Sequence, residues 1–132
     1  MTLQIPPNCD LTLGLTCVDK ATPGRSVWRV TLDERFVNPV GVVQGGFLSA
    51  IADSAMGASA VTAAGERKVH VANTSMKISF IRPARPGMTL TCTARVVKPG
   101  RVVSFVEARI EDDDGRLIAT ASSNYVISER TE

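Results

Sequence analysis

Hydrophobic and polar side chains alternate along most of the 132-residue chain, and breaks that contain Pro or Gly separate the alternating runs. Because successive side chains of a β-strand point to opposite faces of a sheet, such runs predict strands with one buried face. The predicted strands cover residues 11–18, 26–32, 75–81, 88–98, 101–111 and 116–128. The pairs Pro23-Gly24 and Asp114-Gly115 between consecutive runs are typical of hairpin turns, so we expect mainly antiparallel pairing.

Residues 36–65 interrupt this alternation with a long apolar and small-residue stretch. The pair Gly45-Gly46 breaks any preceding element, and Ala, Leu, Ile, Met and Ser then dominate up to Gly65, where a helix is expected to stop. We therefore expect a helix over about residues 46–63. Apolar and small residues occur on nearly every face of this helix, which is typical of a buried helix that packs closely against a surrounding sheet.

The order of elements is two strands, one long helix and then four strands. This order favours the α+β class, with an antiparallel sheet that holds one helix on its concave face. A chain of 132 residues fits one domain, so we assign residues 1–132 to a single domain with residues 1–10 as an irregular lead-in. The uncovered sheet face and the sheet edges favour association with further copies.

Composition narrows the function by excluding several classes. The net charge is +2, the charges are interspersed, and aromatic residues make up 5% of the chain, so we predict no nucleic-acid binding. The N-terminus lacks the pattern of a secretory signal and no apolar run has transmembrane length, so we predict no membrane association. The cysteines Cys9, Cys17 and Cys92 have no metal-binding or disulfide pattern, which indicates a cytoplasmic protein.

Metal and cofactor chemistry have little support in the sequence. His70 is the only histidine, and we interpret it as a surface or structural residue. The acidic residues 112–114 fit a solvated hairpin turn better than a metal site. The sequence therefore predicts neither a metal nor a cofactor.

Asp53 is the only ionisable side chain in residues 36–65. One interpretation is a helix aspartate that reaches solvent or caps a neighbouring backbone group. The other is a functional carboxylate, since burial of an unpartnered carboxylate costs free energy. The amides of Gly45 and Gly46 at the helix start could then stabilise an oxyanion while Asp53 acts as general base or nucleophile. Because Asp53 lies about 12 Å along the helix axis from Gly45, a symmetric dimer would be needed to bring both groups to one reacting carbon.

Four segments in a fixed order carry a family resemblance. They are NPVGVVQGG at residues 38–46, Asp53, TSMKISFIRPA at residues 74–84 and DGRLIA at residues 114–119. In this order and spacing the chain resembles the hotdog-fold thioesterases, in particular the PaaI-type (phenylacetate-pathway) and 4-hydroxybenzoyl-CoA thioesterase branch. The similarity extends from Leu13 to Ile127.

The resemblance implies a sheet wrapped around the helix and hydrolysis of an acyl-CoA thioester. It also implies a homodimer with two sites at the subunit interface, often paired into a homotetramer. Asn38 would orient the thioester or the water, the Gly45 amide would contact the oxyanion, and Asp53 would be the catalytic carboxylate. Either Thr74 or Ser75 would position the water.

One residue departs from the family pattern. The family commonly has His-Gly-Gly where this chain has Gln44-Gly45-Gly46. A glutamine forms hydrogen bonds but exchanges no proton near neutral pH, so Gln44 disfavours a histidine-dependent hydratase and leaves hydrolysis by Asp53 possible.

Further residues are expected to bind the substrate. Gly46, Phe47 and Met56 would shape the acyl pocket, and Arg82 and Arg85 would contact the CoA phosphates. Two alternatives to an enzyme stay open. One is a non-catalytic module that binds acyl-CoA, and the other is a purely structural dimerisation domain. The sequence does not identify the acyl group.

Overall fold

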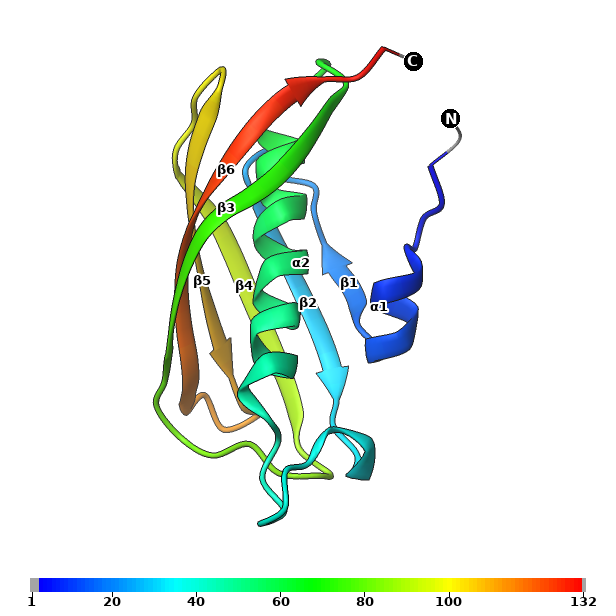
Figure 1. Ribbon diagram of the computed structural model, residues 1–132, viewed down its shortest axis with the longest axis vertical. Helices are drawn as coiled ribbons and strands as arrows, with labels where there is room; N and C mark the ends of the chain where they lie inside the picture. The colour runs from blue at the N-terminus through cyan, green and yellow to red at the C-terminus, as the bar shows by residue number, and fades with distance from the viewer. Residues whose placement is uncertain (1–2, 132) are drawn as a thin grey trace.

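The computed structural model describes residues 3–131, which form one curved sheet, one long helix and two short helical segments (Figure 1). The elements are α1 (Asn8–Leu13), β1 (Thr16–Asp19), β2 (Arg25–Thr31), the 3₁₀ helix η1 (Glu34–Phe36), α2 (Gly45–Ala63), β3 (Val69–Phe80), β4 (Thr89–Lys98), β5 (Val103–Glu111) and β6 (Leu117–Glu129). The sheet curves around α2, so the α+β prediction is confirmed. No helix within residues 3–131 is both long enough and apolar enough to cross a membrane.

The six strands are all antiparallel and lie in the order β1-β2-β4-β5-β6-β3. The β1–β2 and β5–β6 hairpins are those that Pro23-Gly24 and Asp114-Gly115 predicted, and β4–β5 forms a third hairpin. The strand β3 does not pair with β4, which follows it in sequence; it pairs with β6 at the far edge of the sheet. The connection at residues 81–88 therefore crosses from one side of α2 to the other.

The N-terminal segment differs from the prediction of a strand over residues 11–18. Residues 8–13 form α1, and β1 is limited to Thr16–Asp19. The apolar alternation arises because Leu13, at the end of α1, and Leu15, just after it, both enter the core, with exposures of 7% and 5%. Gly14 lies between them with a φ of 71° and ends the helix in the left-handed conformation. The predicted lead-in thus contains the start of a helix, and its residues 1–2 lie outside the described residues.

One face of α2 packs against the sheet and is held there by polar contacts. Ser26 on β2 and Ser59 on α2 are both fully buried, and their hydroxyls lie 2.8 Å apart. The Ser26 hydroxyl also donates to the carbonyl of Ala55 at 2.9 Å, and Trp28 Nε1 donates to Ser26 at 2.9 Å. Because buried hydroxyls cost free energy unless bonded, this cluster fixes how α2 sits on β2.

The opposite face of α2 is open in the single chain, so the prediction of a helix buried on all sides is wrong within one subunit. Gly46, Asp53 and Val61 are exposed, and Ala50 and Gly57 are half-buried. The apolar character of this stripe is a property of the sequence, and within residues 3–131 α1 and the segment before it border only part of it. The open stripe faces the cavity described below.

The strand β3 is longer than predicted and contains a bulge. The pattern predicted a strand only from residue 75, because the register shifts between Asn73 and Ser75. A bulge adds a residue to one strand and so breaks the alternation of side chains. Before the bulge Val71 and Asn73 face α2, and after it Met76 and Ile78 do so.

Candidate active site

Asp53 is exposed on the open face of α2, and two side chains from the sheet hold it. The hydroxyl of Tyr125 on β6 donates to Asp53 Oδ1 at 2.5 Å, and Asn73 Nδ2 on β3 donates to the same oxygen at 3.0 Å. Asn73 and Tyr125 are direct partners across the β3–β6 ladder. All of the side-chain hydrogen bonds that Asp53 makes within residues 3–131 go to Oδ1, so Oδ2 is available to a ligand or to water.

Tyr125 is suited to hold a carboxylate because it stays protonated. Its side chain is 1% exposed, and burial together with the neighbouring Asp53 carboxylate raises the pKa of Tyr125 far above its ordinary value. The phenol therefore donates a hydrogen bond throughout the neutral pH range. The side-chain oxygen of Asn73 accepts from Ser123, which leaves its NH₂ group directed at Asp53.

A cavity of about 560 Å³ lies over the open face of α2 and includes Asp53 in its wall. The walls come from α2, from β3 and β6, and from the N-terminal segment with α1. Apolar residues form much of the lining, among them Ile5, Trp28, Gly57, Ala58, Val61, Val69 and Val71. Asp53, Asn73 and Tyr125 form a polar group in this wall. A concave, largely apolar site with a few converging polar groups is the usual form of a small-molecule site.

The start of α2 presents the amides that the sequence assigned to an oxyanion site. Gln44 is the N-cap residue, but its side chain makes no capping hydrogen bond. Within residues 3–131, no hydrogen bond uses the amide of Gly45 or Gly46 as donor, as is usual for the first turn of a helix. A 310 Å³ cavity lies beside Gly45, and a 350 Å³ cavity lies beside Gln44, Gly46 and Phe47. Both glycines therefore border spaces that a ligand can enter.

Asn38 organises the loop before α2. Its Oδ1 accepts from the amides of Val40 at 3.0 Å and Val42 at 3.1 Å. Its own backbone N–H donates to the Val42 carbonyl at 2.7 Å. The Asn38 side chain thus has a structural task through its oxygen, which leaves Nδ2 as the group that could contact a ligand.

Thr74 and Ser75 do not contact Asp53 within the chain. The Thr74 hydroxyl donates to the Asn124 carbonyl at 3.2 Å, and Ser75 lies in a hollow on the outer face of the sheet beside Lys77 and Ser122. The β3 residue that contacts Asp53 within the chain is Asn73, one position before Thr74. Sequence reasoning missed it because the bulge hid that part of the strand. Tyr125 lies in the strand predicted over residues 116–128, but no pattern connected it with Asp53.

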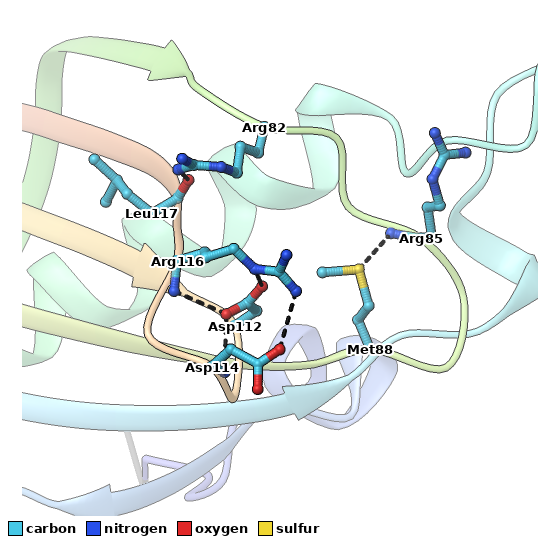
Figure 2. A network of polar contacts seen from close by, with 7 residues as sticks. All are labelled: Arg82, Arg85, Met88, Asp112, Asp114, Arg116 and Leu117. Carbon is cyan, nitrogen blue, oxygen red and sulfur yellow. Dashed lines mark hydrogen bonds and ion pairs between the residues drawn. The ribbon is translucent and has the colours of Figure 1, made fainter.

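The remaining predicted binding residues lie in separate places. Met56 is fully buried in the core, and Phe47 is half-buried and packs on Phe36 with ring centroids 4.8 Å apart. Figure 2 shows Arg82, which donates to the Leu117 carbonyl at 3.0 Å beside the β5–β6 hairpin. The guanidinium of Arg85 extends away from that network. The backbone amide of Arg85 is the group that contacts the sulfur of Met88.

The acidic hairpin is a self-contained turn. Asp112 Oδ1 accepts from the backbone amides of Asp114 at 2.9 Å and Arg116 at 2.8 Å. The Arg116 guanidinium pairs with the carboxylates of Asp112 and Asp114, as Figure 2 shows. The bond from the Arg116 amide is the main cause that lowers the pKa of Asp112. Residues 3–131 contain no group of three or more His, Cys, Asp or Glu side chains placed to hold a metal ion.

A sheet wrapped around one long helix defines the hotdog class of α+β proteins. Comparison with known proteins agrees, since the model of the thioesterase superfamily matches residues 40–119. The chain belongs to the thioesterase superfamily.

Individual relatives support this assignment. The chain is 26% identical to acyl-coenzyme A thioesterase 13 of Homo sapiens over 113 residues, which cover 85% of this chain and 79% of the human protein. A phenylacetic acid degradation-related protein from Ralstonia eutropha is 33% identical, with a TM-score of 0.81 over 91% of this chain and 89% of that one. A Streptococcus mutans protein that was solved with bound acetyl CoA shares the fold, with a TM-score of 0.82 at 16% identity over 89% of this chain and 91% of that one.

The hydrogen bond between Tyr125 and Asp53 should be measurable as a coupling in stability. We expect Tyr125→Phe and Asp53→Ala each to lower the free energy of unfolding, and the double variant to lose about 1 kcal/mol less than the sum. Urea denaturation of the four proteins measures this difference. Asn124→Ala, on the same strand, serves as a control for coupling with Asp53→Ala. Additive losses for the Tyr125 pair would contradict the assigned hydrogen bond.

Proposed function

We propose that this protein hydrolyses an acyl-CoA thioester to a carboxylic acid and free CoA, with Asp53 as the catalytic carboxylate. The observation that carries the proposal is the setting of Asp53: Tyr125 and Asn73 donate to its Oδ1, Oδ2 accepts no hydrogen bond within residues 3–131, and Asp53 lines the 560 Å³ cavity. The name of the human relative and the acetyl CoA in the S. mutans structure support CoA thioesters as the substrate class.

In the proposed reaction, Asp53 acts as a general base on water or as a nucleophile. As a base it takes a proton from water while the water oxygen attacks the thioester carbon. The carbonyl oxygen gains the negative charge and accepts a hydrogen bond from the amide of Gly45, where the positive end of the helix dipole adds stabilisation. The tetrahedral intermediate then collapses, the C–S bond breaks, and the CoA thiolate leaves and takes up a proton. As a nucleophile Asp53 would form an acyl anhydride that water then hydrolyses.

Other residues have supporting roles in the proposal. Asn38 Nδ2 and the Gln44 side chain are neutral donors that precede the helix start in the sequence, and they would orient the thioester. Asn73 occupies the position beside Asp53 that we expected Thr74 or Ser75 to take. Thr74 or Ser75 would therefore position the water only through contacts across a subunit interface. Gly46 and Phe47 would line the substrate path through the 350 Å³ cavity.

CoA carries phosphates, and two arginines lie at the end of the sheet that holds the start of α2. Arg82 lines the 310 Å³ cavity beside Gly45, and Arg85 follows it in the same connection. Neither guanidinium forms an ion pair with a carboxylate within residues 3–131, so both can bind phosphate. We propose these residues as the phosphate contacts.

The proposed site requires a homodimer. Gly45 and Asp53 are about 12 Å apart along α2, too far for both to touch one carbon. The open stripe on α2 and the 12-residue edge strand β3 both border the 560 Å³ cavity, and both features favour pairing with a second copy. Pairing would place α2 of one subunit beside the cavity of the other. A homotetramer of two such dimers and a cytoplasmic location remain predictions.

Replacement of Asp53 tests the chemical proposal. We expect Asp53→Asn to lower kcat by about 10²- to 10⁴-fold, because the amide cannot accept the proton of water or attack the acyl carbon. Release of free thiol from a panel of aryl, short-chain and long-chain acyl-CoAs measures the rate. Asp113→Asn, which changes another exposed aspartate far along the chain, should retain full activity.

The same panel distinguishes the alternative functions. Unchanged turnover in Asp53→Asn would reject Asp53 as the catalytic group. Binding of acyl-CoA without turnover by the wild-type protein would support a non-catalytic binding module. Neither binding nor turnover across the panel would leave the structural dimerisation domain.

Mixing two impaired variants tests whether the site is shared between subunits. In a dimer of Asp53→Asn with Gly45→Ala, one site combines the intact Gly45 of the first subunit with the intact Asp53 of the second. We therefore expect random mixing to restore about one quarter of wild-type activity, because half of the dimers are mixed and each has one intact site. Thiol release after joint refolding measures the recovery. Failure of the mixture to regain activity, with mixed dimers present by native mass spectrometry, would contradict the shared site.

A further inference from the structure

Gly45 is covered by the ring of Phe80. A Cβ atom added at position 45 would lie 2.6 Å from Phe80 Cζ and 3.0 and 3.1 Å from the two Cε atoms. Non-bonded carbon atoms prefer separations of about 3.5–4.0 Å. The aromatic ring therefore lies against the Cα atom of Gly45, in the place that the Cβ atom of any other residue would occupy.

Backbone conformation does not explain the glycine at this position. Gly45 is absent from the glycines with positive φ, unlike Gly41 and Gly65, so an L-residue could adopt its backbone angles. The close approach of Phe80 is the remaining constraint. Position 45 is thus a contact point between the start of α2 and the end of β3, and the two residues depend on each other.

Phe80 is itself an unusual surface residue. It is the last residue of β3, lies opposite Ala119 of β6, and is 53% exposed. Its ring borders the 310 Å³ cavity together with Gly45, Leu48, Ile81 and Arg82. An aromatic side chain at the mouth of a cavity, beside unused helix amides and an arginine, is placed to contact a ligand that enters there.

We propose that Phe80 is a positioning residue for the reaction at Gly45. Its ring shields the Gly45 amide from bulk water on one side and leaves the approach through the cavity as the route to that amide. A hydrogen bond to a developing oxyanion is stronger where water is excluded, so the shield would act mainly in the transition state. The inference rests on the proposed function, in which this amide is the oxyanion contact.

A double-mutant cycle on kcat tests this inference. We expect Phe80→Ala to lower kcat about tenfold with little change in KM, since the contact matters when charge develops. Gly45→Ala should also lower kcat, because the new methyl group displaces the ring. The double variant should be no slower than Gly45→Ala alone, because the ring has already left its place in that variant. Phe80→Leu, which keeps apolar bulk, should retain more activity than Phe80→Ala.

Phe105→Ala provides the matched control, because Phe105 is a similarly exposed phenylalanine (47%) on β5, next to the hollow on the outer face of the sheet. It should leave kcat unchanged, and circular dichroism should show the same fold in every variant. Independent losses that multiply in the double variant would overturn the inference, as would a Phe80→Ala protein with wild-type kcat. In both cases normal wild-type turnover and loss in Asp53→Asn would leave the proposed function intact. No turnover by the wild-type protein would overturn both.

Discussion

The hydrogen bonds from Tyr125 and Asn73 to Asp53 are the interaction on which the candidate site depends. They join α2 to the β3–β6 pair at the point where the sheet curves over the helix. A carboxylate on an otherwise apolar helix needs donors to stay in place, and both donors here reach the same oxygen. The second oxygen accepts no hydrogen bond within residues 3–131, and Asp53 lines the cavity, so the contact that anchors the helix also holds the proposed reactive group.

The sequence predicted the architecture well because alternation and turn residues are local signals. The hairpins, the long helix and the α+β class follow from such signals, and so does the placement of Tyr125 in a strand. Two features were not predictable in this way. The pairing of β3 with β6 is a long-range choice that no local pattern encodes, and the bulge after Asn73 shifts the alternation that marks a strand. As a result the sequence identified Asp53 but missed the residue that orients it.

The family resemblance and the structure contribute different parts of the account. The resemblance pointed to Gly45 and Asp53 as a pair, and the fold places them on one helix, too far apart to share a carbon within a chain. In the proposed dimer both would be used, with a second copy covering the apolar face of α2 that the chain leaves open. Gly45 also has a structural constraint of its own, the ring of Phe80. Position 45 therefore combines a packing requirement with a proposed chemical one.

The central claim is that Gly45 of one subunit and Asp53 of the other meet at the thioester carbon. A crystal structure with an acyl-CoA analogue, in which a methylene group replaces the thioester sulfur, tests it most directly. The account predicts the ketone oxygen within about 3.2 Å of the Gly45 nitrogen, and Asp53 of the partner subunit beside the carbonyl carbon. A ketone bound away from the start of α2, or contacted by Asp53 and Gly45 of the same chain, would contradict it.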